Sequence, residues 1–372
     1  MAKIWLILLM VLQASLCLAT PAKINDLIRE NIKLQPGFSI AIFADNVPRA
    51  RQMALSPDGV VFVGTTSSKG IVYALRASED YSQSIQRFII AEGLNRPNGV
   101  AYKEGSLYVA EVNRISRYDR ITEQLAKPTV PHVVYDQLPA KAHHGLKYLK
   151  FGPDGMLYTG IGAPCNICKP DKNIFATLVR FNPDGSDFEI IAQGIRNTVG
   201  FDWQPGTNSL FFTDNGRDYL GDDLPPEELN QVLKIGAHYG FPYCHGNDVS
   251  DPKFGYQRDC KQFQAPVWTF KAHMAPLGMH FYRGTMLPKA YQGQLLVALH
   301  GSWNRSKPHG YQIALVRFDQ GRPVAEETFA EGWLLETDVF GRPVDILELP
   351  DGSLLISDDY RGVIYRISYQ QP

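Results

Sequence analysis

One pattern of hydrophobic and polar positions recurs along this chain. An apolar strand is followed by a turn that contains Asp-Gly or Gly, and then by a second strand rich in apolar and aromatic residues. Such turns reverse the chain tightly between antiparallel strands, so each copy predicts a β-hairpin. The longer gap between the fourth and fifth copies predicts an insertion. The six copies occupy residues 52–65, 98–111, 147–162, 199–215, 279–301 and 344–359.

Further apolar segments lie between these hairpins, at residues 71–75, 115–119, 177–182, 313–318 and 363–367. Evenly spaced units of about four strands are typical of propeller blades, because neighbouring blades bury the faces that one hairpin leaves exposed. The pattern therefore predicts an all-β protein, a six-bladed β-propeller in a single domain over residues 20–372. Residues 22–36 predict a short helix before the first blade. A β-sandwich, the alternative, gives no reason for repeated copies of one pattern.

The N-terminus departs from this pattern. Lys3 precedes an apolar run over residues 4–19, and Cys17 lies in a segment that resembles a signal-peptide cleavage site. The run is short for a bilayer span. We predict that residues 1–19 are a signal peptide, that the mature chain has no transmembrane helix, and that the protein is periplasmic or secreted. The alternatives are a lipoprotein cleaved before Cys17 and an uncleaved membrane anchor.

Four cysteines follow this segment: Cys165, Cys168, Cys244 and Cys260. An even number in an exported chain favours disulfides. We predict the pairs Cys165–Cys168 and Cys244–Cys260, because each closes a short loop. The alternative is a four-cysteine zinc site, which would require the two distant pairs to converge. Lys169, where a haem-attachment motif would have histidine, excludes that motif.

The charge balance narrows the class of partner. The chain has 37 Lys and Arg and 38 Asp and Glu, a formal net charge of −1. This balance gives no electrostatic reason to expect nucleic acid or an anionic membrane as a partner. The sequence also lacks a Gly-x-Gly-x-x-Gly motif after a strand, which argues against a nicotinamide cofactor.

Polar residues precede several of the hairpins at equivalent positions. His143 and His144 precede the third copy, Arg196 and Asn197 the fourth, and Arg342 the sixth. In a propeller, these positions meet at one mouth of the central channel, and departures from a packing pattern mark functional sites. Arginine and asparagine suit a planar, oxygen-rich, anionic ligand, and histidine suits proton transfer.

Two further polar segments lie in the second half of the chain. Residues 213–230 are dense in acidic residues and turns, which suits Ca²⁺ because it takes carboxylate and backbone carbonyl oxygens. The alternative is a solvated acidic loop. Residues 300–310 contribute Trp303, Asn304, Arg305 and Lys307, and Asn304 begins a glycosylation sequon.

The order of these motifs resembles the soluble, pyrroloquinoline-quinone (PQQ)-dependent sugar dehydrogenases, in particular the sorbosone and aldose sugar dehydrogenase branch. The resemblance covers most of residues 36–369. It implies a six-bladed propeller that binds PQQ and Ca²⁺ at the channel mouth, oxidises a sugar, and passes electrons to a separate acceptor, a cytochrome or a quinone. The motifs are HGLKYLKFGPDG (144–155), GIRN (194–197), TDNGRDYLGDDLPPEELN (213–230), HYGFP (238–242) and GRPVD (341–345).

The resemblance also implies roles for individual residues. His144 matches the general base, and Arg196 and Asn197 match the pair that contacts the quinone oxygens, with Arg196 also stabilising the charge that develops there. The resemblance further implies cofactor contacts by Arg342, Arg305 and His273, substrate contacts by His143 and Asn98, and Ca²⁺ ligands from the backbone carbonyls of Gly216 and Arg217.

Two positions depart from the glucose-oxidising members of that family. Ala163 stands where those members have an aspartate that orients the histidine, so another group must orient His144. His143 stands where they have an acidic substrate contact, which argues against glucose as the substrate. Two other classes of function remain as alternatives: a Ca²⁺-dependent lactonase-type hydrolase and a non-catalytic binding propeller.

Overall fold

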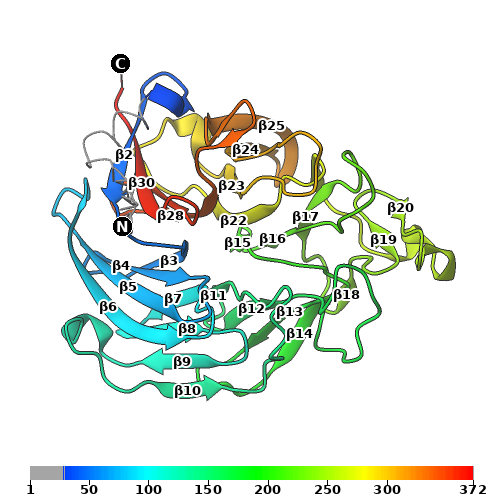
Figure 1. The fold of residues 1–372 in the computed structure, drawn as a ribbon, viewed down its shortest axis with the longest axis horizontal. Helices are drawn as coiled ribbons and strands as arrows, with labels where there is room; N and C mark the ends of the chain where they lie inside the picture. Colours follow the sequence, from blue (N-terminus) through cyan, green and yellow to red (C-terminus); the bar gives the residue numbers. More distant parts are fainter. Residues whose placement is uncertain (1–27, 29, 372) are drawn as a thin grey trace, which may run out of the picture.

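The computed structural model of the chain describes residues 28 and 30–371. It is a six-bladed β-propeller, as predicted, with six sheets arranged in a ring (Figure 1). The predicted signal peptide lies outside the described residues, as does most of the helix expected at 22–36. Residues 28, 30 and 31 are helical, but the expected helix does not reach residue 36, because Lys33–Leu34 form strand β1.

The first three blades are antiparallel meanders of four consecutive strands. Blade 1 is β3 (Ala50–Leu55), β4 (Val60–Thr65), β5 (Gly70–Ala77) and β6 (Ser84–Leu94). Blade 2 is β7 (Gly99–Lys103), β8 (Ser106–Ala110), β9 (Ile115–Tyr118) and β10 (His132–Tyr135). Blade 3 is β11 (Leu149–Phe151), β12 (Leu157–Ile161), β13 (Thr177–Phe181) and β14 (Glu189–Gln193), with β18 (Ala237–His238) added in parallel to β14.

The last three blades complete the ring. Blade 4 is β15 (Phe201–Trp203), β16 (Leu210–Asp214), β17 (Glu227–Gln231) and β21 (Trp268–Phe270). Blade 5 is β22 (Pro276–Phe281), β23 (Leu295–Leu299), β24 (Gln312–Asp319) and β25 (Arg322–Glu331), with β1 at its edge. Blade 6 is β28 (Pro343–Glu348), β29 (Leu354–Asp358), β30 (Val363–Tyr369) and β2 (Phe38–Ala44). Two short hairpins are β19 (Cys244–His245) with β20 (Val249–Ser250), and β26 (Leu334–Leu335) with β27 (Asp338–Val339).

Each of the six sequence copies forms the first two strands of one blade, and every predicted intervening segment forms the third strand of its blade. The sequence copies coincide with the observed strands because strands that are buried on both faces need continuous apolar runs. All six residues of β4, for example, are buried. The acidic segment at 213–230 is a loop only in its middle, because its first two residues end β16 and Glu227–Gln231 form β17.

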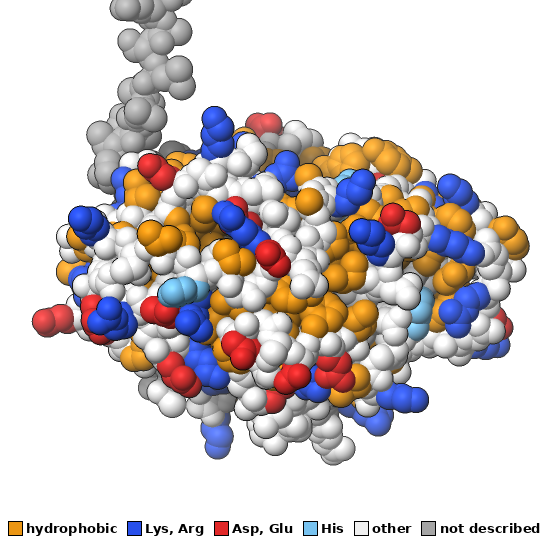
Figure 2. Space-filling model, turned by 90° about the horizontal axis from the view of Figure 1, so that it is seen from below, with side chains coloured by type: hydrophobic (Ala, Val, Ile, Leu, Met, Phe, Trp, Pro, Cys, Tyr) orange, Lys and Arg blue, Asp and Glu red, His pale blue; other side chains and the backbone are white. Residues whose placement is uncertain are grey.

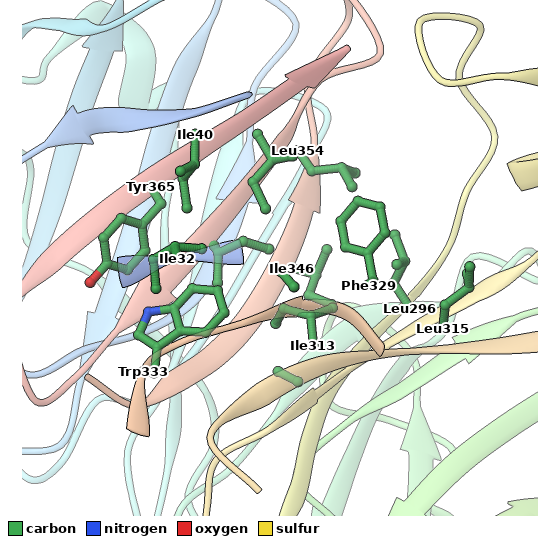
Figure 3. Close-up of a cluster of buried hydrophobic side chains, with 14 of the residues drawn as sticks. Ile32, Ile40, Leu296, Ile313, Leu315, Phe329, Trp333, Ile346, Leu354 and Tyr365 are labelled. Atoms are coloured by element: carbon green, nitrogen blue, oxygen red, sulfur yellow. The ribbon is translucent and has the colours of Figure 1, made fainter. Parts of the chain in front are cut away.

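The ring is closed by β2, the second strand of the described chain. Strand β2 pairs with β30, so Ile40 lies opposite Ile367 and blade 6 combines both ends of the described chain (Figure 1). Closing a sheet ring in this way leaves no open first or last blade. The apolar cluster between blades 5 and 6 includes Ile40 and is built around Trp333 and Tyr365, both fully buried (Figure 3).

The expected insertion lies between β17 and β21 and projects from the ring with β19 and β20 (Figure 1). Both predicted disulfides are confirmed: Cys165 pairs with Cys168, and Cys244 with Cys260. The zinc alternative is therefore wrong. Among the described residues, the helices are too short and polar for membrane crossing. Figure 2 shows a face on which Lys and Arg alternate with Asp and Glu, in keeping with the near-zero net charge.

Candidate functional site

A cavity of about 570 Å³ opens at one end of the propeller axis, where loops from around the ring meet. This volume is in the range of small-molecule and cofactor sites. The predicted site residues that line it are His143, His144, Arg196, Asn197, Gly216, His273 and Arg342. Residues that lie far apart in the sequence, before different blades, therefore meet at one mouth.

A second cavity of about 500 Å³ lies at the opposite end of the axis, since Leu55 at the end of β3 lines it while Arg51 at the start of β3 lines the first. Its charged side chains are paired with one another. Asp202 binds Lys150 at 2.7 Å and Arg283 at 3.0 Å. We therefore regard the first cavity, whose charges are less balanced, as the candidate site.

His144 is held by an unusual backbone and by a carbonyl. Its φ of 48° is in the left-handed region, a strained conformation for a non-glycine residue that is concentrated at functional sites. Gly162 leaves room for this turn, since a Cβ there would lie 2.5 Å from the His144 Cβ. The Nδ1 atom of His144 lies 2.9 Å from the carbonyl oxygen of Ala163. Ala163 thus orients the imidazole through its backbone.

This hydrogen bond assigns the tautomer of His144. A carbonyl oxygen only accepts, so Nδ1 carries the proton and Nε2 keeps a lone pair. Burial, with smaller contributions from Arg196 and His143, lowers the pKa of His144 to about 2. The imidazole is therefore neutral at physiological pH, with Nε2 able to accept a proton. The His143 ring packs against it, with ring centroids 4.1 Å apart.

Arg196 is almost fully engaged by the protein. Its Nε donates to the Asn166 carbonyl at 2.9 Å, and its Nη1 donates to the Asn215 carbonyl at 3.0 Å. Its Nη2 donates to the Asn166 Oδ1 at 2.7 Å and to the Asp218 Oδ2 at 3.1 Å. A guanidinium has five N–H donors, so one Nη1 N–H lacks an acceptor among the described residues. Arg196 lines the cavity, where a ligand oxygen could accept that donor.

Buried carboxylates of the acidic segment hold the backbone of this mouth. Asp214 accepts the backbone N–H groups of Arg196 at 2.8 Å and Asn197 at 2.5 Å. Glu227 accepts the Gly216 N–H at 2.6 Å. Burial raises the pKa of Asp214 to about 6 and that of Glu227 to about 8. These carboxyl groups therefore hold the backbone of the mouth in place. The interpretation of the acidic segment as a Ca²⁺-binding segment stays a prediction.

Three predicted site residues do not line the cavity. Asn98 is buried and does not line the cavity; its Oδ1 accepts from Arg51 Nε at 2.8 Å. The Arg217 side chain pairs with Asp251 at 2.7 Å, and the role of its backbone carbonyl as a Ca²⁺ ligand stays a prediction. Arg305 binds the loop carbonyl of Asp222 rather than lining the cavity.

Arg51 and His300 line the cavity although the sequence analysis missed them. Asp359 joins them, because its carboxylate accepts from Arg51 at 3.0 Å and from His300 at 2.9 Å. Arg342 donates to the Gly301 carbonyl at 2.8 Å beside them. A signal for Arg51 existed, since it precedes the first sequence copy as Arg196 and Arg342 precede later copies. No comparable signal existed for His300, because it follows an apolar strand and does not precede a sequence copy.

Two exposed aromatic side chains stand at the rim. Trp303 lines the cavity with 66% of its surface exposed, and Tyr219, 67% exposed, lies edge-on to it with ring centroids 5.9 Å apart. The loops that carry them are tied together, because Arg305 and Ser306 both bind Asp222. His273 adds a hydrogen bond of 2.8 Å to a carbonyl of the same rim, that of Gly221.

Known proteins resemble this chain over most of its length. The family model described as TrAA12-like matches residues 32–370. An uncharacterized protein of Borreliella burgdorferi is 35% identical over 361 residues, 92% of each chain. Aldose sugar dehydrogenase YliI of Escherichia coli is 27% identical over 278 residues, 68% of this chain and 67% of the relative.

Solved structures share the fold at low sequence identity. The calcium structure of Trichoderma reesei Carbohydrate-Active Enzymes Family AA12 matches with a TM-score of 0.79 and 18% identity, covering 91% of this chain and 97% of the other. The holo form of the pyranose dehydrogenase PQQ domain from Coprinopsis cinerea matches with a TM-score of 0.75, at the same identity and coverage. The resemblance stated from the motifs is confirmed at the level of family and fold.

Proposed function

Because the chain belongs to the TrAA12-like family, we propose that it is a dehydrogenase that oxidises a sugar, or a related polyol or aldehyde, with PQQ and Ca²⁺. We further propose that it is exported and passes electrons to a separate acceptor, a cytochrome or a quinone. The observation that carries the proposal is the pairing, in one cation-lined cavity, of a neutral imidazole with an arginine that keeps a free donor.

The residues present fit the cofactor. PQQ is planar and carries three carboxylates, and four arginines line the cavity: Arg51, Arg96, Arg196 and Arg342. Of these, the Arg96 side chain donates to the Ala142 carbonyl and has no ion pair among the described residues. Arg196, Asn197, Arg342 and Arg51 would hold the cofactor. We propose the backbone carbonyls of Gly216 and Arg217 as Ca²⁺ ligands, since the nearby carboxylates are committed to N–H groups.

The chain's own residues supply the acid–base chemistry. When bound, PQQ accepts the hydride equivalent that leaves the substrate carbon. His144 takes the proton of the substrate hydroxyl at Nε2, because Nδ1 is fixed on the Ala163 carbonyl. Arg196 would offer its remaining N–H to the cofactor oxygen where negative charge develops, and a preorganised donor of this kind stabilises a transition state.

The rim gives the substrate a place to bind. Trp303 exposes an aromatic face at the cavity, and an aromatic ring can cover the apolar C–H face of a sugar while the hydroxyl groups remain solvated. His143 is next to His144 and is more exposed, which suits contact with a sugar hydroxyl. Two disulfides support export, because disulfides persist in oxidising compartments.

The alternative functions have weaker support. A lactonase-type hydrolase needs carboxylates that converge on a metal, and no group of three or more His, Cys, Asp or Glu arranged for a metal exists in the part of the chain that the structure describes. A non-catalytic propeller would have no use for the strained, oriented and neutral His144.

Reconstitution tests the proposal. The purified protein is treated with a chelator, and PQQ is added with and without Ca²⁺. The absorbance of the cofactor and dye reduction are followed across a panel of aldoses, sorbosone and simple alcohols. Stoichiometric, Ca²⁺-dependent binding with dye reduction is the expected result. No binding at micromolar PQQ would overturn the proposal, and lactone hydrolysis would then be the next activity to assay.

A further inference from the structure

One short segment, residues 163–168, contacts the two side chains that act chemically in the proposed reaction, His144 and Arg196, and also contacts His143. The Ala163 carbonyl accepts from His144, the Cys165 backbone hydrogen-bonds His143, and Asn166 binds Arg196 twice. We propose that Asn166, held in the ring closed by Cys165 and Cys168, is the positioning residue of Arg196. This inference rests on the proposed function for the role of Arg196, but the position of the arginine can be tested without cofactor.

Asn166 presents two acceptors to one edge of the guanidinium. Its backbone carbonyl oxygen accepts from Arg196 Nε at 2.9 Å, and its side-chain Oδ1 accepts from Arg196 Nη2 at 2.7 Å. Two parallel bonds fix the plane of an arginine as well as its position. The nearby ion pair with Asp218, at 3.1 Å, supplies charge but only a single contact. Asn166 therefore determines the plane in which the free Nη1 N–H lies.

Asn166 is itself fixed by the opposing loop. Its Oδ1 also accepts the Asp218 N–H at 2.9 Å, and its Nδ2 donates to the Asp218 carbonyl at 3.3 Å. Both ends of the side-chain amide are thus engaged, so its orientation is determined. The segment and the loop that carries Asn215 and Asp218 form one unit around Arg196.

The disulfide explains how a loop residue keeps both acceptors aligned. Cys165 and Cys168 are separated by 3 in sequence, whereas Cys244 and Cys260 are separated by 16. In the chain-entropy account, stabilisation grows with the size of the closed loop, so the smaller ring contributes less to global stability. Its effect is local, because it restricts the backbone on both sides of Asn166.

The first test follows Arg196 in the protein without cofactor. Hydrogen exchange of the Arg196 Nε–H is measured by NMR on arginine-labelled protein, and the signal is assigned by its loss in Arg196→Lys. We expect Asn166→Ala to speed this exchange by at least 10-fold, since the Nε acceptor loses its fixed position. Asn166→Asp keeps the acceptor for Nη2 but loses the Nδ2 donor to the Asp218 carbonyl, so its exchange should be slower than that of Asn166→Ala and faster than that of the parent. The matched control is Asn182→Ala, because the Asn182 amide binds Ser186 and Asp187 on the surface.

The second test separates the two disulfides. The double substitution Cys165→Ser with Cys168→Ser should reproduce the faster Arg196 exchange of Asn166→Ala. The double substitution Cys244→Ser with Cys260→Ser should leave it unchanged, because the acceptors of Arg196 belong to Asn166, Asn215 and Asp218, outside the loop that Cys244 and Cys260 close. If the second pair fails to fold, the comparison with Asn182→Ala still decides the question.

Kinetics then connect the position of Arg196 to turnover. In the reconstituted enzyme, we expect Asn166→Ala to lower kcat by about 10- to 100-fold, the usual cost of losing a partner that orients a site group, with KM changed by less than roughly threefold. Unchanged Arg196 exchange together with unchanged kcat in Asn166→Ala would overturn the inference. Failure of the parent protein to bind PQQ would instead overturn the proposed function, while the exchange experiment would still report on Asn166.

Discussion

At the residue scale, His144 shows how a backbone carbonyl can replace a carboxylate. The Ala163 carbonyl fixes the imidazole at 2.9 Å and selects the tautomer, but it adds no negative charge. Burial therefore dominates, and the pKa of His144 falls to about 2. A carboxylate partner would have raised this pKa. The imidazole is thus neutral at physiological pH, as the proposed general base has to be.

The first prediction concerns this residue. His144→Ala should lower kcat by about 10²- to 10⁴-fold, the contribution of a positioned general base, while PQQ still binds. Turnover of the reconstituted variant and titration of cofactor absorbance measure the two effects separately. His143→Ala is the neighbouring control, and its main effect should be on KM for the sugar. Full activity of His144→Ala would remove this residue from the role of base.

The second prediction concerns Lys147, which is 2% exposed and whose Nζ donates only to the Gly145 carbonyl, at 2.8 Å. Burial lowers its pKa from 10.5 to about 7. Between these values the unfolded chain binds the proton and the folded chain does not, so stability rises with pH across this window and is lost as pH falls towards 7. Below pH 7 the folded protein carries the charge in a site that disfavours it.

Lys147→Met removes this charge and leaves an unbranched apolar side chain that is one atom shorter. The variant should therefore be more stable than the parent at pH 6, and its advantage should shrink as the pH approaches 10. Thermal unfolding of both proteins from pH 6 to pH 10 measures the difference. An advantage that stays constant over this range would show that the buried charge is not its cause.

Whether the position of a site residue can be predicted depends on whether the local sequence indicates it. The positions of Arg196, Asn197 and Arg342 at the cavity could be predicted, because each precedes a repeated hairpin and the repeat determines where that position lies. Asn166 could not be predicted as a partner of Arg196, since the two residues are 30 apart and meet only through the fold.

At the scale of elements, the acidic segment shows where pattern reading fails. Glu227 and Glu228 are polar in sequence, yet both are buried in β17. Their carboxyl oxygens accept the backbone N–H groups of Gly216 and Gly246, at 2.6 Å each. A strand whose buried positions are occupied by hydrogen-bonded carboxylates has no apolar periodicity, so the sequence indicates a loop.

The third prediction distinguishes Arg342, which lines the cavity, from Arg305, which connects two loops of the rim. Arg342 lines the cavity, whereas Arg305 binds Asp222 and Asp223 across the rim. Arg342→Ala should weaken PQQ binding by about 10-fold or more, since a charged hydrogen bond is lost. Arg305→Ala should change PQQ affinity little and should speed proteolysis of the 216–224 loop. Equal losses of affinity in both variants would contradict this division.

At the scale of the whole molecule, the repeated hairpins made the propeller fold predictable, but they did not indicate how the ring of blades is closed. Six copies of one local pattern are visible in the sequence, and each forms its own blade. The pairing of β2 with β30 joins residues more than 300 positions apart, as in the contact between Ser39 and Ser368. Such a long-range pairing leaves no periodic signal, because β2 completes a blade that begins at the other end of the chain.

The last prediction tests this closure. Ile40 is 6% exposed and packs in the cluster between blades 5 and 6, whereas Ser39 on the same strand is exposed. Ile40→Asp places a carboxylate without a partner in an apolar site, so the unfolding midpoint should fall by roughly 5 °C or more. Ser39→Asp adds the same charge on the outer face and should shift the midpoint far less. Thermal unfolding by circular dichroism compares the two variants. If they unfold at the same temperature, β2 does not contribute to closing the ring, and this strand is an appendage rather than part of blade 6.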